Sequence, residues 1–142
     1  MAINLPREIF LSHSSLDVQF ATNLAAVIRR HGIPVWYSQT NILGAQQWQD
    51  EIGAALDRCD WFAVVVSPQS AGSMWVKREL SYALVQKQFE NKIVPILHQP
   101  ATVEQIKQLS WLLSLFQMID FTGLFDDGCR DLLRIWGIGY QP

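Results

Sequence analysis

The sequence predicts one α/β domain, residues 1–142, with a flavodoxin-like, doubly wound sheet of five parallel strands in the order 2-1-3-4-5 and helices on both faces. Short apolar runs alternate with longer amphipathic segments along the whole chain, as in βαβ units. The run Trp61–Val66 is apolar on both faces, as a central parallel strand must be. The right-handed crossover rule and a length of 142 residues without linker or repeat then favour this strand order.

The first half of the chain alternates in this way. Glu8–Ser12 is a short apolar run and predicts the first strand. The segment Leu16–His31 has apolar residues at helical spacing and is closed by Gly32, so it predicts a helix. Ile33–Tyr37 predicts the second strand, and Gln46–Arg58 repeats the helical spacing before the central strand begins.

The second half continues the alternation to the end of the chain. A helix is expected over Ser73–Phe89, with a serine as its cap, and a fourth strand over Lys92–Leu97 despite an internal proline. A short helix, Thr102–Ser110, precedes a short fifth strand, Phe116–Ile119. The closing helix, Asp126–Trp136, begins with acidic residues, which suit the positive end of a helix dipole.

Composition excludes several classes of protein. Hydrophobic residues make up 49% and charged residues 17%, which argues against disorder. A net charge of −2 gives no basic surface for nucleic acid, and no apolar run is long enough to cross a membrane. The start of the chain is not a secretory signal, so a cytoplasmic protein is expected. Cys59 and Cys129 lack metal or redox spacing and are expected to be buried, inert thiols.

The strand order reverses between the first and third strands, and ligands of such sheets bind beyond the carboxyl ends of the strands at that point. The helix that follows the third strand places Trp75 and Glu79 four residues apart, on one face. An indole beside a carboxylate suits a sugar or nucleotide, and burial beside the ring would raise the pKa of the carboxyl while leaving it largely ionised near neutral pH. The alternative is that Trp75 packs in the core and Glu79 meets solvent or a cation.

Other ligand-binding proteins of this architecture are disfavoured by the residues at the same edge. A receiver domain needs an aspartate where Ser67 ends the third strand, and a flavodoxin needs a glycine in the loop Ser12–Ser15. The glycine-rich motifs G-x-G-x-x-G and G-x-x-x-x-G-K-[ST] and the nucleophile motif G-x-S-x-G are absent. His13 is the one histidine expected at this edge, more as a hydrogen-bonded loop residue than as a general base.

From Ile9 to about Trp136 the chain carries an ordered series of short motifs. These are Ile9–Ser15 with Asp17; Val35–Tyr37 followed by Ile42, Gly44, Trp48 and Ile52; Cys59-Asp60 with Val64–Ser67; and Trp75-Val76 with Glu79-Leu80, followed by Ile93–Ile96. Through the order and spacing of these motifs, rather than through any one of them, the chain resembles a TIR (Toll/interleukin-1 receptor homology) domain of the bacterial, NAD-cleaving kind.

The resemblance implies cleavage of the nicotinamide–ribose bond of NAD⁺, with Glu79 as the catalytic residue and Trp75 as a wall of the pocket. NAD⁺ would be the substrate, so neither a cofactor nor a metal is implied. The products would be nicotinamide and either ADP-ribose or a cyclic isomer, in bacterial immune (anti-phage) signalling. The remaining substrate-binding residues implied by the family are Phe10, Leu11, Ser12 and His13 at the nicotinamide end, and Leu43, Gly44 and Trp48 in the loop that opens and closes the pocket.

A non-catalytic module that signals through TIR–TIR contacts is the alternative function. The two functions are compatible, because family enzymes self-associate and the loop 39–47 of one protomer would then meet its neighbour. A separate sensor or effector protein would supply activation unless the chain is an excised domain. Ser38 and Leu43 replace an acid and a proline of many members, so contacts of this loop with adaptors are not carried over. Among the six tryptophans, Trp36 and Trp61 are expected in the core.

Overall fold

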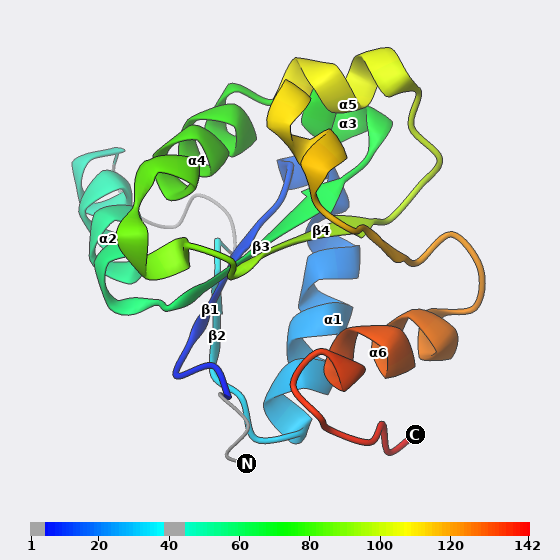
Figure 1. Cartoon of the computed structure of the whole chain (residues 1–142). Helices are drawn as coiled ribbons and strands as arrows, with labels where there is room; N and C mark the ends of the chain where they lie inside the picture. Colours follow the sequence, from blue (N-terminus) through cyan, green and yellow to red (C-terminus); the bar gives the residue numbers. More distant parts are fainter. Residues whose placement is uncertain (1–4, 39–44) are drawn as a thin grey trace.

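The structure is a sheet of five parallel strands in the order β2-β1-β3-β4-β5, which confirms the predicted fold class (Figure 1). The computed structural model describes residues 5–38 and 45–142, and for 45–49 the backbone alone. The strands are β1 (Ile9–Ser12), β2 (Val35–Tyr37), β3 (Trp61–Val66), β4 (Ile93–Leu97) and β5 (Ile119–Asp120).

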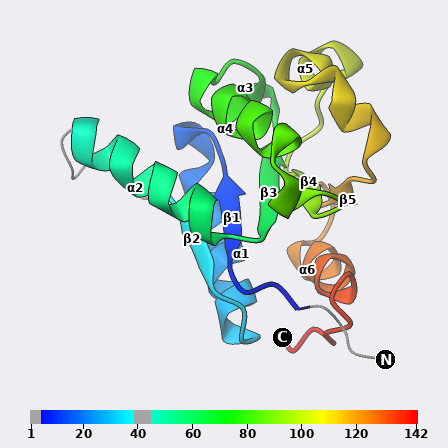
Figure 2. The same cartoon turned by 60° about the vertical axis from the view of Figure 1, so that its left-hand side comes forward.

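Helices cover both faces of this sheet (Figure 2). α1 and α6 pack on one face, and α2, α4 and α5 pack on the other. None of the helices in the described ranges combines the length and apolar character needed to cross a membrane. The α-helices are α1 (Val18–Arg30), α2 (Ala45–Arg58), α3 (Pro68–Ala71), α4 (Met74–Val85), α5 (Val103–Leu109) and α6 (Phe125–Arg134), and the 3₁₀ turns are η1 (Ser15–Asp17), η2 (Lys87–Phe89) and η3 (Trp111–Leu115).

Strands β1 to β4 each contribute to two separate cores, because successive side chains point to opposite faces. In β1, Ile9 and Leu11 pack on the α1 side, and Phe10 packs on the α4 side. Among the described tryptophans, Trp136 is fully buried, whereas Trp36 and Trp61 are half-buried against the α4-side and α1-side cores respectively. The expectation that these two lie in the core is therefore only partly correct.

Several element boundaries differ from the prediction. The segment after β3, expected as a loop, contains α3, because Ser67 and Ser70 form a capping box around its first turn. The fifth strand is shifted toward the C-terminus, since the residues before it form η3, capped by Ser110. On the side that faces β5, β4 is paired only at Ile96 and Leu97. Pro95, which has no backbone N–H to donate, therefore lies outside the part of β4 that pairs with β5.

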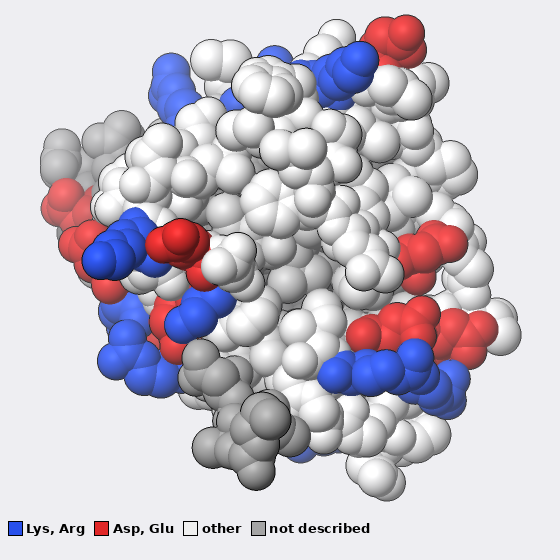
Figure 3. Space-filling view, in the orientation of Figure 1, with Lys and Arg blue, Asp and Glu red and all other residues white. Residues whose placement is uncertain are grey.

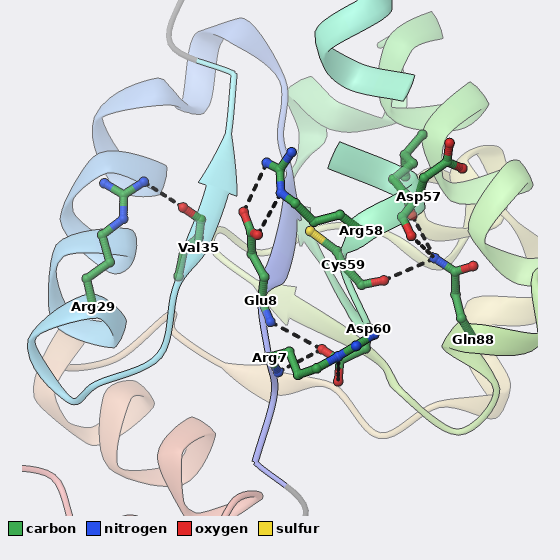
Figure 4. A network of polar contacts seen from close by, with 10 residues as sticks. Arg7, Glu8, Arg29, Val35, Asp57, Arg58, Cys59, Asp60 and Gln88 are labelled. Carbon is green, nitrogen blue, oxygen red and sulfur yellow. Dashed lines mark hydrogen bonds and ion pairs between the residues drawn. The ribbon is translucent and has the colours of Figure 1, made fainter. Parts of the chain in front are cut away.

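A network of polar contacts holds the amino edge of the sheet together (Figure 4). Asp60, just before β3, accepts hydrogen bonds from the backbone N–H groups of Arg7 and Glu8, just before β1, at 2.9 and 3.2 Å. The Arg58 guanidinium donates to both carboxylate oxygens of Glu8 at 2.7 and 3.1 Å. This edge is fixed by charge and main-chain contacts, which leaves the opposite, carboxyl edge as the place for a site.

Candidate functional site

The helix α4 carries Glu79 toward the sheet. The helix begins after Ser73, whose hydroxyl accepts a hydrogen bond from the N–H of Val76 at 3.3 Å. The buried residues of α4 recur every three or four positions, so they form one stripe along the helix. They are Val76, Glu79, Leu80 and Ala83. Glu79 is thus the one acid on a stripe that is otherwise apolar.

The carboxylate of Glu79 meets the end of β1, as the topology predicts. Glu79 is only 8% exposed and Ser12 only 1% exposed. The hydroxyl of Ser12 donates a hydrogen bond to Oε1 of Glu79 at 2.7 Å. Burial raises the pKa of Glu79 to about 7, and the hydrogen bond from Ser12 opposes that rise. The direction agrees with the prediction, but the rise is larger than expected: the protonated and ionised forms are comparably populated near neutral pH.

Trp75 lies one turn before Glu79, at the surface rather than in the core. It is 38% exposed, and the Arg78 guanidinium carbon lies 5.7 Å from the centre of its ring. The alternative that Trp75 packs in the core is therefore wrong, and its role as a wall of the pocket stays a prediction. A partly exposed indole next to a buried carboxylate offers a flat apolar surface on which a ring of a ligand can stack.

The other sequence-predicted residues of β1 and its loop are only partly brought to Glu79. Phe10 is fully buried on the α4 side and stacks against the ring of Trp36 at 4.9 Å. Leu11 packs on the opposite face of the sheet, so its side chain points away from Glu79. His13 has both ring nitrogens at carbonyl oxygens, Nδ1 2.7 Å from that of Ser14 and Nε2 3.0 Å from that of Ser38. Their roles toward a substrate stay predictions.

The predicted loop residues cannot be placed. Leu43, Gly44 and the side chain of Trp48 lie outside the described residues. The same is true of most of the segment 39–47, which is expected to open and close the pocket. The described part of the site therefore consists of β1, the loop that follows it, and α4.

A second polar cluster at the carboxyl edge was not predicted as a unit. Asp17 is 2% exposed, and its Oδ2 accepts a 2.5 Å hydrogen bond from the hydroxyl of Ser67. Nε2 of His98 lies 3.9 Å from Oδ1, while the His98 ring stacks on Phe20 of α1 with centroids 4.0 Å apart. Ser67 and His98 directly follow β3 and β4, so both lie at the carboxyl edge of the sheet. This shared position is the feature of the sequence from which their proximity could have been predicted. The cluster lies on the α1 side and joins three chain segments.

Other chemistry is not supported by the described residues. In residues 5–38 and 45–142, no three His, Cys, Asp or Glu side chains are grouped so as to hold a metal ion. The thiols of Cys59 and Cys129 are buried and free, as expected, and burial raises the pKa of each to about 12. A cavity of about 480 Å³ lies between β5 and α6, but its Asp131 and Arg134 face each other at 3.6 Å. It holds no buried acid like Glu79.

Solved structures of TIR domains have a similar fold. The TIR domain of the Toll-related receptor TRR-2 from Hydra magnipapillata has a TM-score of 0.66 at 18% identity, over 90% of each chain. The TIR domains of the Roq1 resistosome, which recognises the effector XopQ, have a TM-score of 0.56 at 23% identity, over 92% of this chain and 78% of that one. At these identities the likeness concerns the fold.

Two curated proteins are similar in sequence, and both are named as enzymes. "Probable 2' cyclic ADP-D-ribose synthase TcpO" of Methanobrevibacter olleyae is 24% identical over 113 residues, which is 79% of this chain. "2' cyclic ADP-D-ribose synthase BtTIR" of Bacteroides thetaiotaomicron is 26% identical over 94 residues, 65% of this chain. The chain spans about a third of the length of each, 33%. The TIR domain family model matches residues 9–133, and the chain therefore belongs to the TIR domain family.

Proposed function

We propose that this TIR domain cleaves the nicotinamide–ribose bond of NAD⁺. The observation that carries the proposal is the placement of Glu79: a carboxylate that is 8% exposed, at the carboxyl end of β1, one helical turn after the partly exposed Trp75. Burying an acid without a cationic partner destabilises a fold, so such a group is more often found in a functional site than in a structural one. Oε2 of Glu79 has no hydrogen bond from the described residues and is free to meet a ligand.

The chemistry assigned to Glu79 follows from its charge. When the bond between C1′ of the ribose and the nicotinamide nitrogen breaks, the bonding pair leaves with neutral nicotinamide and positive charge develops on the sugar. The ionised carboxylate stabilises this charge and accepts hydrogen bonds from ribose hydroxyls. Attack by water gives ADP-ribose, and attack by an oxygen or nitrogen of the same ADP-ribose gives a cyclic isomer. Trp75 supplies a flat surface against a ring of the dinucleotide.

The relatives support the same reaction class. Both curated proteins are named 2' cyclic ADP-D-ribose synthases, and their similarity covers 79% and 65% of this chain. We further propose a role in immune, anti-phage signalling, in which a cyclic ADP-ribose isomer would act as the messenger, as the resemblance to bacterial TIR domains implies. NAD⁺ is the substrate in this proposal, and the protein needs neither cofactor nor metal for the reaction.

The test compares the wild-type protein with Glu79→Gln at high protein concentration, with NAD⁺ present and products followed by mass spectrometry. Glutamine keeps the size and one accepting oxygen, replaces the other oxygen by a donating NH₂ group, and cannot carry charge. Loss of one charged transition-state contact lowers kcat by about 10² to 10³. Glu104→Gln, an exposed acid on α5, is the matched control and should keep full activity. Equal nicotinamide release by wild type and Glu79→Gln would remove the role assigned to Glu79.

A second candidate function, association through TIR–TIR contacts, is favoured by exposed apolar side chains. Trp111 and Leu115 on η3 are 66% and 74% exposed. On the face drawn in Figure 3, charges gather toward the rim, and the middle, among α4, α5 and α6, is uncharged. Exposed apolar side chains on a weakly charged face favour contact with a partner surface. Sedimentation of wild type against Trp111→Ser over a range of concentrations tests it: a wild type that stays monomeric throughout excludes self-association of the domain alone.

A further inference from the structure

The hydroxyl of Ser12 touches the reactive side chain of the proposed reaction. Ser12 ends β1 and lies on the same face of that strand as Phe10, whose side chain packs on the α4 side. Its Oγ donates to Oε1 of Glu79 at 2.7 Å, which is the short distance of a hydrogen bond to a charged oxygen. Ser12 is 1% exposed, so water has little room to replace the hydroxyl if it is removed.

Among the residues that the structure describes, the surroundings of Glu79 offer no charged substitute for this contact. Helix α4 makes its main contacts with β1, β3, α3, α5 and η2. The first three contain no ionisable side chain. The pKa of Glu79 is raised by burial and lowered by the Ser12 hydrogen bond, without a contribution from a charged neighbour. The charged residues on the remaining elements are Glu104 and Lys107 on α5 and Lys87 on η2.

Two further ionisable residues are close in sequence but are engaged elsewhere. His13 follows Ser12, and its ring nitrogens lie against the carbonyl oxygens of Ser14 and Ser38. Arg78 precedes Glu79, and its guanidinium lies over the ring of Trp75. In the described part of the chain, Ser12 is therefore the residue that fixes the carboxylate.

We propose that Ser12 is a positioning residue for Glu79: its hydroxyl holds Oε1, so that Oε2 is the oxygen that meets the ribose. The inference rests on the proposed function, since it assigns a role within the same site. A hydroxyl that donates to a carboxylate stabilises the ionised form and fixes its orientation. Ser12 thereby keeps more of Glu79 in the form that can stabilise a positive sugar, against the burial that favours the neutral form.

The experiment removes the hydroxyl and follows kcat/KM for NAD⁺ from about pH 5 to 9. In Ser12→Ala, loss of one charge-assisted hydrogen bond should move the acidic limb of the profile upward by about one pH unit. At a pH below both inflections this is about a tenfold loss of kcat/KM, and the loss shrinks as pH rises. Ser12→Cys keeps the size and donates only weakly, so it should shift the limb in the same direction.

Ser67→Ala is the matched control. Ser67 directly follows the neighbouring strand β3. Its hydroxyl also donates to a buried carboxylate, that of Asp17, but on the α1 side. This variant loses a helix cap and a buried hydrogen bond, so its melting temperature falls, while its pH profile keeps the wild-type inflection. Loss of stability by itself is therefore not expected to move the acidic limb of the pH profile, whereas Ser12→Ala is expected to move it.

A second readout separates this inference from the proposed function. The carboxyl carbon of Glu79, labelled with ¹³C and assigned by its absence in Glu79→Gln, reports its titration directly by NMR without any turnover. Its midpoint should rise by about one pH unit in Ser12→Ala. A wild type that releases no nicotinamide refutes the proposed function and leaves this titration measurable. An unchanged midpoint and an unchanged acidic limb in both Ser12 variants would overturn the positioning role.

Discussion

Replacing Glu79 by glutamine should stabilise the protein at alkaline pH. Burial raises the pKa of this carboxyl from its ordinary value of 4.5 to about 7 in the folded protein. Below pH 4.5 the group is protonated in both the folded and the unfolded state, so its protonation costs nothing there. As pH rises from 4.5 to about 7 the unfolded chain releases this proton while the folded protein keeps it, and stability falls.

The size of the effect follows from the same two values. At about 1.4 kcal/mol for each pH unit, the interval from 4.5 to about 7 corresponds to about 3 kcal/mol of unfolding free energy. Glutamine does not titrate, so Glu79→Gln escapes this loss. The free energy of unfolding of Glu79→Gln minus that of wild type should therefore grow by about 3 kcal/mol between about pH 4 and pH 8.

The assay is urea unfolding followed by circular dichroism at several pH values, with the two proteins compared under identical conditions. All other titrating groups are shared and cancel in the difference. Glu104→Gln, which changes an exposed acid, is the control and should give a difference independent of pH. If the difference in unfolding free energy between Glu79→Gln and wild type is also independent of pH, burial does not raise the pKa of Glu79 and the electrostatic description of the site is wrong.

Three further outcomes follow from packing and burial. Cys59 and Cys129 should resist a thiol-specific disulfide reagent in the native protein and react after denaturation, because burial raises the pKa of both thiols to about 12; rapid native labelling would contradict this. Gly128→Ala should lower the unfolding free energy by about 1–3 kcal/mol, since a Cβ there would lie 2.4 Å from the ring of Phe121. Gly53→Ala, in α2 with no atom within 4 Å of the new Cβ, should raise it by about 0.5–1 kcal/mol. Urea titrations measure both, and equal effects of the two glycine substitutions would refute the packing argument.

The two edges of the sheet differ in how their acidic groups are paired, and this difference explains how the fold tolerates the buried carboxyl group of Glu79. At the amino edge, Asp60 and the Glu8–Arg58 pair tie the strands together through hydrogen bonds of 2.7–3.2 Å. At the carboxyl edge, Glu79 receives one hydrogen bond from the described residues and lacks a cationic partner there. The stability lost by burying this acid is offset by contacts elsewhere, as is usual for functional sites.

The sequence alone determined the class of fold and the region of the site. The apolar run of β3 and the alternation of periods were enough to predict a parallel sheet covered on both faces, because a strand buried on both faces has almost no other pattern available. The crossover rule and the chain length then favoured the strand order that the structure has. The spacing of Trp75 and Glu79 placed both on one side of a helix at the sheet's reversal point. The weakest element, β5, was misplaced since two residues carry too little pattern to compete with the 3₁₀ turn before them.

Only the tertiary structure decided the details on which the chemistry depends. Side chains alternate across a strand, so whether Leu11 or Ser12 faces α4 depends on the position of β1 relative to the helix, which local sequence does not encode. The depth of Glu79, and with it a pKa of about 7, depends on atoms brought together from distant segments. The same holds for the contact between Asp17 and Ser67, 50 residues apart, because desolvation and hydrogen bonding are properties of the packed molecule.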